Sequence, residues 1–272
     1  MTCRPSRRLL GASLAAASLA LAPGPAQALP SSTPDSSAYV ANKGVNNVER
    51  SGNRTYIGGD FTFLRANAQH SALFDANGKR TLPQVDVTGS QVVASAPDDA
   101  GGFFIGGSFT HVGGVARNNI AHILADGGVD PNFNPNANDA VSDVAVADGA
   151  VYASGFFDQI GGLARNSIAK LSAASGGTTS TFDPNANNAV LDVAPTAPAV
   201  YAAGLFTTIG GQPRNSLAAL SPTSGNAFST WNPNANDAAG ALEAEGNNVY
   251  AGGSFTQIGG QPRQGYAQFT AP

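Results

Sequence analysis

An arginine recurs at one place in four copies of a repeated sequence pattern, three residues after a Gly-Gly pair. A guanidinium group presents its N–H donors in a rigid fork, so four such groups could bind an anionic or hydroxyl-rich ligand once per copy. The same fork could instead hold each turn against nearby carbonyl groups, and this structural role is the interpretation that we favour. The four candidate binding residues are Arg117, Arg165, Arg214 and Arg263.

Acidic side chains at equivalent places in neighbouring copies suggest a second kind of chemistry. Asp143 and Asp192 correspond to each other, and Asn47 takes the same place in the first copy. If the strands that carry them surround a common axis, one carboxyl group could act as general acid and another as base or nucleophile on a glycosidic bond. Alanine stands at this place in the two remaining copies. We therefore predict no catalytic residue and treat these three side chains as candidates for a channel site.

A metal site has little support. An Asn-Pro-Asn-Ala-Asn block offers oxygen atoms, with Asp139 and Asp237 just beyond two of its copies, but each copy has at most one or two carboxylates, fewer than a calcium site normally contains. Asn and Pro also form turns by themselves, which is the role we predict. His70, His111 and His122 lack the spacing of metal ligands. We expect no metal, and no cofactor, because the Gly-Gly pairs lie between strands and do not open a helix.

These residues belong to a repeat of 48 or 49 residues that occurs five times. Each copy contains two small residues, a variable residue and a phenylalanine. A Gly-Gly turn and the Asn-Pro-Asn block follow in the later copies, whereas the first copy has lost both. We expect the phenylalanines in the core, and the small residues beside an aromatic side chain of the next copy. The phenylalanines are Phe61, Phe109, Phe157, Phe206 and Phe255.

Each copy is predicted to form four short antiparallel strands. In the third copy these are residues 141–146, 151–157, 167–173 and 178–182. Such a unit is typical of a propeller blade, and a solenoid is the weaker alternative. The last copy stops after its third strand, and the extended residues 37–42 could supply the fourth. We therefore predict an all-β fold, a single five-bladed β-propeller over residues 37–272, closed by an N-terminal strand that completes the last blade.

The first 28 residues have the features of a secretory signal peptide. A basic start is followed by an apolar run at residues 9–21 and by the triplet Ala26-Gln27-Ala28. The run is too short to span a bilayer, and we expect no membrane span in the mature protein. We predict cleavage after the triplet, a short linker over residues 29–36, and a secreted or extracytoplasmic protein.

The sequence says less about the route of export and the class of partner than about the fold. The pair Arg7-Arg8 resembles a twin-arginine signal, which would mean export after folding. The chain's one cysteine, Cys3, lies in the predicted leader, so no disulfide is expected. With 33 Gly, 17 Pro and only 12% charged residues, the chain favours short elements and tight turns. A net charge of -4 gives no support for a nucleic-acid partner.

The three strings Gly-Gly-x-Phe-Thr, x-Ile-Gly-Gly-x-x-Arg-Asn and Phe-Asn-Pro-Asn-Ala together resemble the delta-60 repeat family of secreted bacterial proteins. That family is assigned to β-propellers of a Kelch-like or galactose-oxidase-like kind. The resemblance covers about residues 37–272 and implies the fold and secretion, but it brings no catalytic residue to this chain. The sequence departs from the pattern in the first copy and at Ser154, Ala203 and Gln264.

A repeated fold gives repeated weak sites, which a multivalent ligand can engage together. We therefore predict a non-catalytic binding or scaffold module for glycans or cell-envelope components. Three alternatives stay open: a glycoside hydrolase or lyase with acidic residues in the axial channel, a purely structural or adhesive envelope protein, and a propeller stabilised by a metal. The sequence does not determine the ligand, the oligomeric state, the end of the propeller that is used, or a dependence on calcium.

Overall fold

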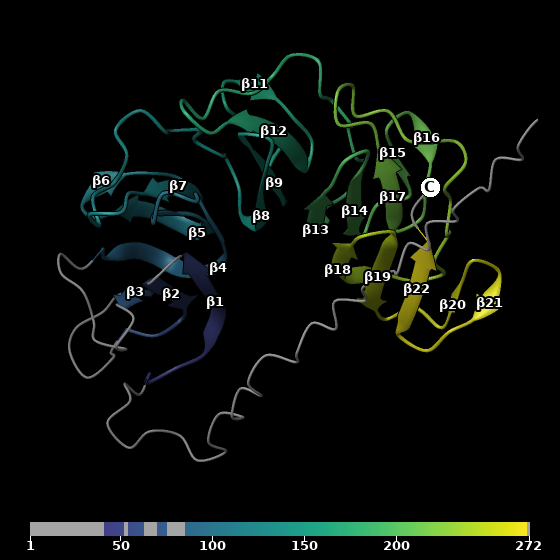
Figure 1. Ribbon diagram of the computed structural model, residues 1–272, viewed down its shortest axis with the longest axis horizontal. Coiled ribbons are helices and arrows are strands. Elements are labelled where there is room, and N and C mark those ends of the chain that lie inside the picture. Colours follow the sequence, from purple (N-terminus) through teal and green to yellow (C-terminus); the bar gives the residue numbers. More distant parts are fainter. Residues whose placement is uncertain (1–40, 52–53, 63–69, 75–84, 271–272) are drawn as a thin grey trace, which may run out of the picture. The chain divides into compact units, whose positions relative to one another are not determined.

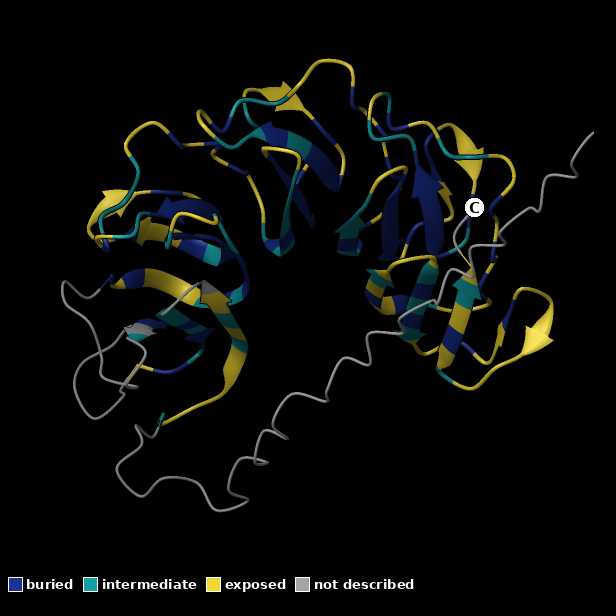
Figure 2. Cartoon of the chain, in the orientation of Figure 1, coloured by how far each residue is buried: buried dark blue, intermediate teal, exposed yellow. Residues whose placement is uncertain are grey.

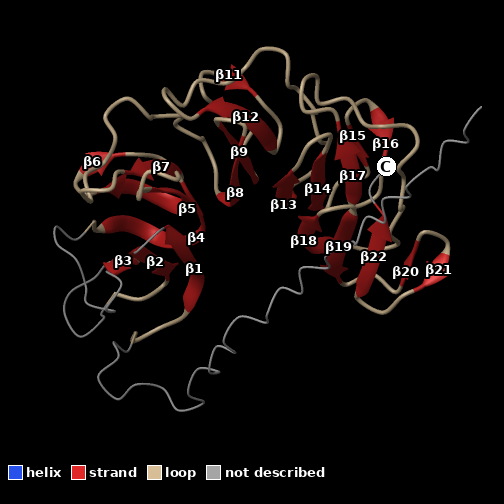
Figure 3. Cartoon of the chain, in the orientation of Figure 1, coloured by secondary structure: helices blue, strands red, loops and turns tan. Residues whose placement is uncertain are grey.

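Strands and turns make up the described part of the chain. The computed structural model describes residues 41–270 except 52–53, 63–69 and 75–84, and these residues contain no helix (Figure 1, Figure 3). Accordingly, no described helix could cross a membrane. The described residues belong to one compact unit, Tyr39–Pro272. The predicted leader, the predicted linker, and residues 37–40 of the predicted closing strand lie outside the described residues.

Each copy of the repeat forms an antiparallel sheet, and we number these sheets as blades 1 to 5 in chain order. Blade 1 has β1 (Val45–Ser51), β2 (Arg54–Gly59) and β3 (Ser71–Phe74). Blade 2 has β4 (Val87–Pro97), β5 (Phe103–Val112), β6 (Val115–Ala116) and β7 (Ile120–Ile123). Blade 3 has β8 (Val141–Ala147), β9 (Ala150–Gly155) and β12 (Ile168–Ser172). Blade 4 has β13 (Val190–Pro195), β14 (Val200–Gly204) and β17 (Leu217–Leu220). Blade 5 has β18 (Ala239–Glu245), β19 (Asn248–Gly253) and β22 (Tyr266–Thr270).

The Gly-Gly turns form small hairpins beyond the second strand of each later blade. They join β10 (Gln159–Ile160) to β11 (Leu163–Ala164), β15 (Thr208–Ile209) to β16 (Gln212–Pro213), and β20 (Gln257–Ile258) to β21 (Gln261–Pro262). In blade 2 the long strand β5 carries the hairpin itself by pairing with β6. The hairpins separate the second main strand from the third, as the repeat pattern predicts.

In blades 2 to 4 the fourth strand is shorter than predicted. It is one bridge to the third strand, through the pairs Ile123–Val129, Leu171–Thr178 and Leu220–Ala227. In blade 2, Pro131 follows the bridge within two residues, and proline has no N–H with which to extend a ladder. The predicted fourth strand is therefore reduced, in these three blades, to a segment that pairs with the third strand at one bridge, and we call it the outer segment. Among the described residues of blade 5, no such segment follows β22.

Tight turns and apolar runs explain the main strands. Asp148 and Gly149 link β8 to β9 with φ values of 51° and 70°, the left-handed conformation that a two-residue hairpin turn requires. Strands β9 and β14 are buried along their whole length (Figure 2). Their side chains are apolar at consecutive positions because both faces of these sheets pack against neighbouring sheets.

The small-small-x-Phe tetrads lie where successive blades meet. All five phenylalanines are buried, as predicted. A Cβ on the second small residue would collide with backbone: on Gly155 it would meet the carbonyl oxygen of Ala140, beside the bulge in β8. A Cβ on Gly106 would lie 2.7 Å from Cγ1 of Val141 in the next blade. The small residues thus make room for a valine and a bulged backbone, and the prediction of an aromatic neighbour is wrong.

Hydrophobic clusters join each blade to the next. One cluster includes Tyr56 of blade 1 and Val92 of blade 2, and the next includes Phe104 of blade 2 and Val144 of blade 3. Two further clusters join blade 3 to blade 4 and blade 4 to blade 5. We call each such contact between successive blades a joint. Burial of apolar side chains at the joints is the main stabilising contribution to this arrangement.

The described end of the predicted closing strand belongs to blade 1. Ala41 packs against the cluster of Phe61 and Ala72. The side chain of Asn42 donates to Thr62 Oγ1 at 3.1 Å and accepts from the Thr62 N–H at 3.0 Å. Asn236, the last residue of an Asn-Pro-Asn block, contacts Thr256 of blade 5 in the same way. Asn42 therefore corresponds to the last residue of such a block, although the residues before it do not keep the pattern.

Candidate functional site

Three of the four candidate arginines are buried within their own blades. Arg117, Arg165 and Arg214 expose only 5–7% of their surface. In each, Nη1 donates to the carbonyl of the preceding residue at 2.7–2.8 Å, and Nη2 donates to a carbonyl of the outer segment at 2.8–3.0 Å. The guanidinium fork therefore ties the hairpin to the outer segment, and these heads do not reach solvent as a ring of ligand sites.

Arg263 differs because its blade has no described outer segment. It is exposed, and its Nη1 donates to the carbonyl of Pro262 at 2.9 Å. Among the four candidates, it is the one whose head lies at the surface.

The Asn-Pro-Asn blocks are hydrogen-bonded turns. Asn187 Oδ1 accepts from the backbone N–H groups of Thr207 and Thr208, at 2.9 and 3.0 Å. Asn185 has a positive φ of 48°, and its Oδ1 accepts from the Asn166 side chain at 2.6 Å. The amide oxygens that sequence reasoning weighed as calcium ligands thus bind N–H groups, which fits the predicted turns.

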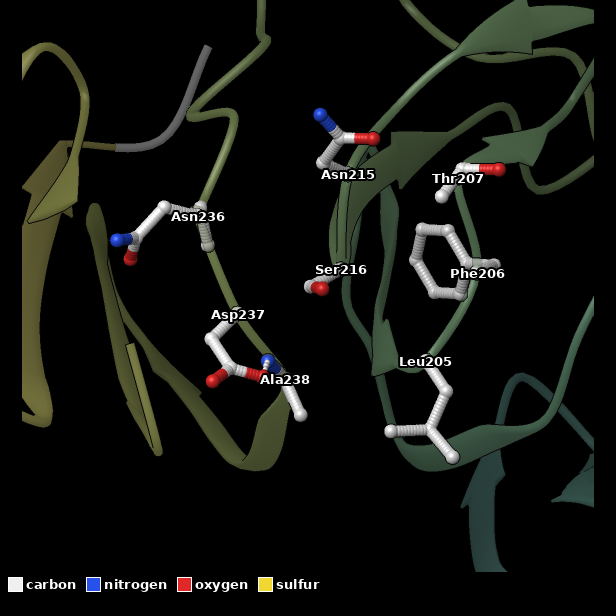
Figure 4. A pocket seen from close by; sticks show the side chains of 9 residues that line it. Leu205, Phe206, Thr207, Asn215, Ser216, Asn236, Asp237 and Ala238 are labelled. Atoms are coloured by element: carbon white, nitrogen blue, oxygen red, sulfur yellow. Dashed lines mark hydrogen bonds between the residues drawn. The ribbon is translucent and has the colours of Figure 1, made fainter. Parts of the chain in front are cut away.

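A cleft opens at the joint between blades 4 and 5, where these turns meet the tetrad. Asn236 and Asp237 line one side, and Phe206, Thr207 and Ser216 line the other (Figure 4). The cleft measures about 350 Å³. The complete lining is Leu205, Phe206, Thr207, Asn215, Ser216, Ala235, Asn236, Asp237 and Ala238.

The same cleft recurs at the joint between blades 2 and 3, with about 370 Å³. Phe109, Thr110, Asn118 and Asn138 take the places of Phe206, Thr207, Asn215 and Asn236. We call these two pockets the joint clefts. Their linings combine a buried phenyl ring with exposed amide and hydroxyl groups, which can both donate and accept hydrogen bonds.

The variable residue of the tetrad is Leu205 in the cleft between blades 4 and 5 and Ser108 in the cleft between blades 2 and 3. Leu205 is 41% exposed. Phe156, at the equivalent position in blade 3, is 52% exposed but lines neither joint cleft. An exposed apolar face next to amide groups suits the two faces of a sugar ring, one of C–H groups and one of hydroxyls.

The first strands of all five blades line a second kind of site, which we call the axial pocket. It measures about 430 Å³ and brings together Asn47, Asp143 and Asp192, the three residues that the sequence placed in a channel. Glu49 and Glu243 add two further carboxyl groups to the lining. The three residues that the repeat alignment placed at equivalent positions thus line one pocket, together with two glutamates to which the alignment gave no weight.

The two aspartates of the axial pocket are committed to contacts between blades. Oδ2 of Asp143 accepts from the Val193 N–H at 3.0 Å, and Oδ2 of Asp192 accepts from the Leu242 N–H at 2.7 Å. The two carboxyl groups also affect each other's titration. Burial raises the pKa of Asp143, and burial together with the charge of Asp143 raises the pKa of Asp192 to about 7. The pair therefore favours holding a shared proton.

His122 forms a buried cluster that sequence reasoning missed. Its Nδ1 lies 2.9 Å from Asp130 Oδ2 and its Nε2 lies 3.0 Å from Asp98 Oδ2, while its ring stacks on Phe104. Hydrogen bonds from His122 help to hold the pKa of both carboxyl groups below the usual value, against the opposing effect of burial. Within the described residues, no group of three His, Cys, Asp or Glu side chains has the geometry of a metal site.

Comparison with known proteins bears on the fold. The model of a family described as "Domain of unknown function (DUF5122) beta-propeller" matches residues 104–133. A crystal structure of the Cps50 (Swd1) beta-propeller domain of Myceliophteria thermophila is similar, with a TM-score of 0.50 and 10% identity over 79% of this chain and 64% of that chain. The WD40 beta-propeller domain of Doa1 gives 0.44 and 12% identity, over 78% of this chain and 63% of that chain. No curated protein matches the sequence. With five repeated antiparallel sheets joined face to face, the chain is a repeat protein of the β-propeller type.

Proposed function

We propose that the protein is an exported, non-catalytic binding module whose joint clefts hold a hydroxyl-rich ligand, such as a glycan or another cell-envelope polymer. The observation that carries the proposal is the recurrence of one cleft at two joints. Its amide and hydroxyl groups suit sugar hydroxyls, and Leu205, in the cleft between blades 4 and 5, suits the C–H face of a sugar. Weak sites repeated along one surface favour a repeating polymer, because each further contact becomes intramolecular.

We propose the clefts, and not the arginines, as the ligand site. Burial of Arg117, Arg165 and Arg214 supports a structural role for their guanidinium groups. Arg263 keeps an exposed head and remains a candidate for contact with an anionic group of the ligand.

Export and the finer fold rest on the sequence. The features of residues 1–28 support a signal peptide, with Arg7-Arg8 as a twin-arginine alternative. The resemblance to delta-60 repeats supports a secreted bacterial protein with a Kelch-like ring. We propose five blades, with an N-terminal strand that completes the last one.

A second candidate function is hydrolysis or lysis of a glycosidic bond in the axial pocket, favoured by the paired carboxyl groups of Asp143 and Asp192. Retaining enzymes hold such groups about 5–5.5 Å apart and inverting enzymes about 6.5–9.5 Å apart. Both carboxyl groups already accept a backbone N–H group of the next blade, which supports a structural role for them and binding over catalysis. Cleavage of glycans that is lost in Asp143→Asn would overturn this choice.

The test is binding to a panel of glycans and cell-wall fractions, with a variant of Leu205 in the cleft between blades 4 and 5. We expect Leu205→Ala to weaken binding about 3- to 10-fold, since it removes roughly 1 kcal/mol or more of apolar contact. Val115→Ala is the matched control, because Val115 is also exposed on a blade but lines neither cleft. Equal binding by both variants would place the ligand elsewhere. No binding to any fraction would favour the purely structural role.

A further inference from the structure

One charged side chain lines the cleft between blades 4 and 5. It is the exposed carboxylate of Asp237, which directly follows the last asparagine of an Asn-Pro-Asn block. Among the described residues that line this cleft, none of the others is a lysine, arginine, histidine, aspartate or glutamate. Arg263, the exposed arginine of blade 5, does not line it. A ligand held in this cleft therefore meets an anionic group and no cationic one.

The acceptor atoms of two other lining residues are already hydrogen-bonded within the protein. Asn236 Oδ1 accepts from the N–H groups of Thr256 and Gln257, at 2.9 Å each. Thr207 Oγ1 accepts from the Asn187 side chain at 2.8 Å. What these two residues still offer a ligand is N–H and O–H donors, which suit the oxygen atoms of sugar hydroxyls.

Asp237 supplies an open acceptor in the same cleft. Its Oδ1 accepts from the Ala238 N–H at 2.7 Å, whereas its Oδ2 has no hydrogen bond to any described residue. An ionised carboxylate only accepts hydrogen bonds and an ammonium group only donates them, so the two form a short, charge-assisted bond. Asp237 and Leu205 lie on opposite sides of the cleft (Figure 4). A sugar between them can contact Leu205 with its C–H face and Asp237 with an amine.

The cleft between blades 2 and 3 is a neutral counterpart. Ser90 and Ser108 are among the described residues that line it, and no charged side chain is. Asp139 stands at the repeat position of Asp237, and its Oδ1 accepts from the Ala140 N–H at 2.6 Å in the same way, but it does not line this cleft. The two clefts therefore share amide and hydroxyl groups and differ in charge.

We infer that the cleft between blades 4 and 5 selects an amino sugar with a free, positively charged amine, which Asp237 recognises, and that the cleft between blades 2 and 3 takes a neutral sugar. The matching polymer is a partly N-acetylated glycan, because it carries both kinds of sugar. A sugar acid would bring its carboxylate against that of Asp237 and is disfavoured. This inference rests on the function proposed above and names the ligand class of the same clefts.

Two trisaccharides test the selection, one of glucosamine and one of N-acetylglucosamine. Each is titrated calorimetrically into the full chain at mildly acidic pH, where the amines are protonated. We expect the glucosamine trimer to bind about 2- to 5-fold more tightly, as for a partly exposed ion pair. In Asp237→Asn the ratio of the two affinities should fall by the same factor, about 2- to 5-fold, and in the natural chain it should fall at high salt.

The matched control is Asp139→Asn. It removes an equivalent carboxylate with the same backbone contact, outside the linings of both clefts, and should leave the ratio unchanged. Equal affinities for the two trimers, or an equal change of the ratio in both variants, would overturn the inference and leave the clefts as sugar sites. Binding of neither trimer would overturn the proposed function with it. A lysine trimer that binds as tightly as the glucosamine trimer, and weakens as much in Asp237→Asn, would show that the carboxylate attracts any cation and would overturn selection of a sugar.

A carboxylate added to the neutral cleft gives the reverse test. Ser90 is exposed and lines this cleft, so Ser90→Asp adds a charge there without burying it. We expect this variant to bind the glucosamine trimer about 2- to 5-fold more tightly than the natural chain does, with no gain for the N-acetylglucosamine trimer. Equal gains, or none, would contradict the assignment of a neutral sugar to this cleft.

Discussion

At the scale of single residues, the repeated arginines fit two roles, ligand binding and attachment of the hairpin turn. Only the groups that contact each guanidinium in the structure distinguish between these roles. Arg214 donates to Pro213 and Phe228, and both acceptors are backbone carbonyls. The sequence could predict that the four arginines are equivalent, because the repeat fixes their place. It could not predict that Arg263 is exposed, because that depends on an outer segment contributed after the third strand.

Replacement of a buried arginine should therefore cost stability. Arg214→Ala leaves two carbonyl groups without their charged donor, and we expect the free energy of unfolding to fall by about 2–4 kcal/mol. Arg263→Ala, at the exposed counterpart, should change it by less than about 0.5 kcal/mol. Urea unfolding of both variants measures the difference. Equal losses would contradict the structural role of the buried fork.

The aspartates of the axial pocket predict a pH dependence. A carboxyl group whose pKa is raised on folding contributes stability that is complete below its unfolded pKa, near 3.9, and is lost as pH rises through its folded pKa. For Asp192 that folded value is about 7, so we expect stability to fall between about pH 4 and pH 7 by roughly 2–4 kcal/mol. Asp98 and Asp130 act oppositely and below this window, because their pKa values are lowered.

The matching variant is Asp192→Asn, which keeps an oxygen for the Leu242 N–H but cannot ionise. Unfolding measured from pH 4 to pH 8 should show a flatter profile for the variant than for the natural chain. An unchanged slope would mean that Asp192 does not carry the titration.

At the residue scale, the cluster of His122 could not be predicted from the repeat pattern. Asp98, His122 and Asp130 meet in blade 2, but the other blades carry different residues there, for example Lys170 and Gln268 at the place of His122. A cluster that occurs in one blade leaves no periodic signal. Asp98 lies in the turn between β4 and β5, and Asp130 lies in the outer segment. Their contact with the imidazole ring of His122 can be predicted only when the positions of both segments are known.

At the scale of elements, the glycine at the second place of the tetrad accepts the bulge of the first strand. Gly155→Ala would put a Cβ against the carbonyl oxygen of Ala140, and backbone cannot move aside as a flexible side chain can. We expect a loss of about 2–3 kcal/mol in the free energy of unfolding. Gly177→Ala is the control, because a Cβ there meets only Ser175 Oγ at 3.5 Å. Equal stability of the two variants, measured by thermal unfolding, would remove the close approach as the reason for the glycine.

The strands of blade 3 show which elements the sequence predicts well and which it does not. The third strand of blade 3 and its turn were predictable from alternation and from Gly176-Gly177, but the fourth strand was predicted too long. Residues 178–182 pair only through Thr178, and Phe182 leaves the ladder to pack its ring on Tyr152. An apolar residue at the end of a short run marks burial, and it does not distinguish a strand from a segment that turns into the next blade.

At the scale of the whole molecule, recurrence of the joint clefts predicts that affinity grows with ligand length. An oligosaccharide that fills one cleft should bind weakly, and a polymer that reaches a second cleft should bind about 10- to 100-fold more tightly. Leu205→Ala, which damages one cleft, should reduce the affinity for the polymer toward that for the oligomer while changing Tm little. Calorimetric titration with a length series measures both effects. Affinity that is independent of length would show that each ligand meets a single site, and the argument from repeated clefts would then fail even if a glycan binds.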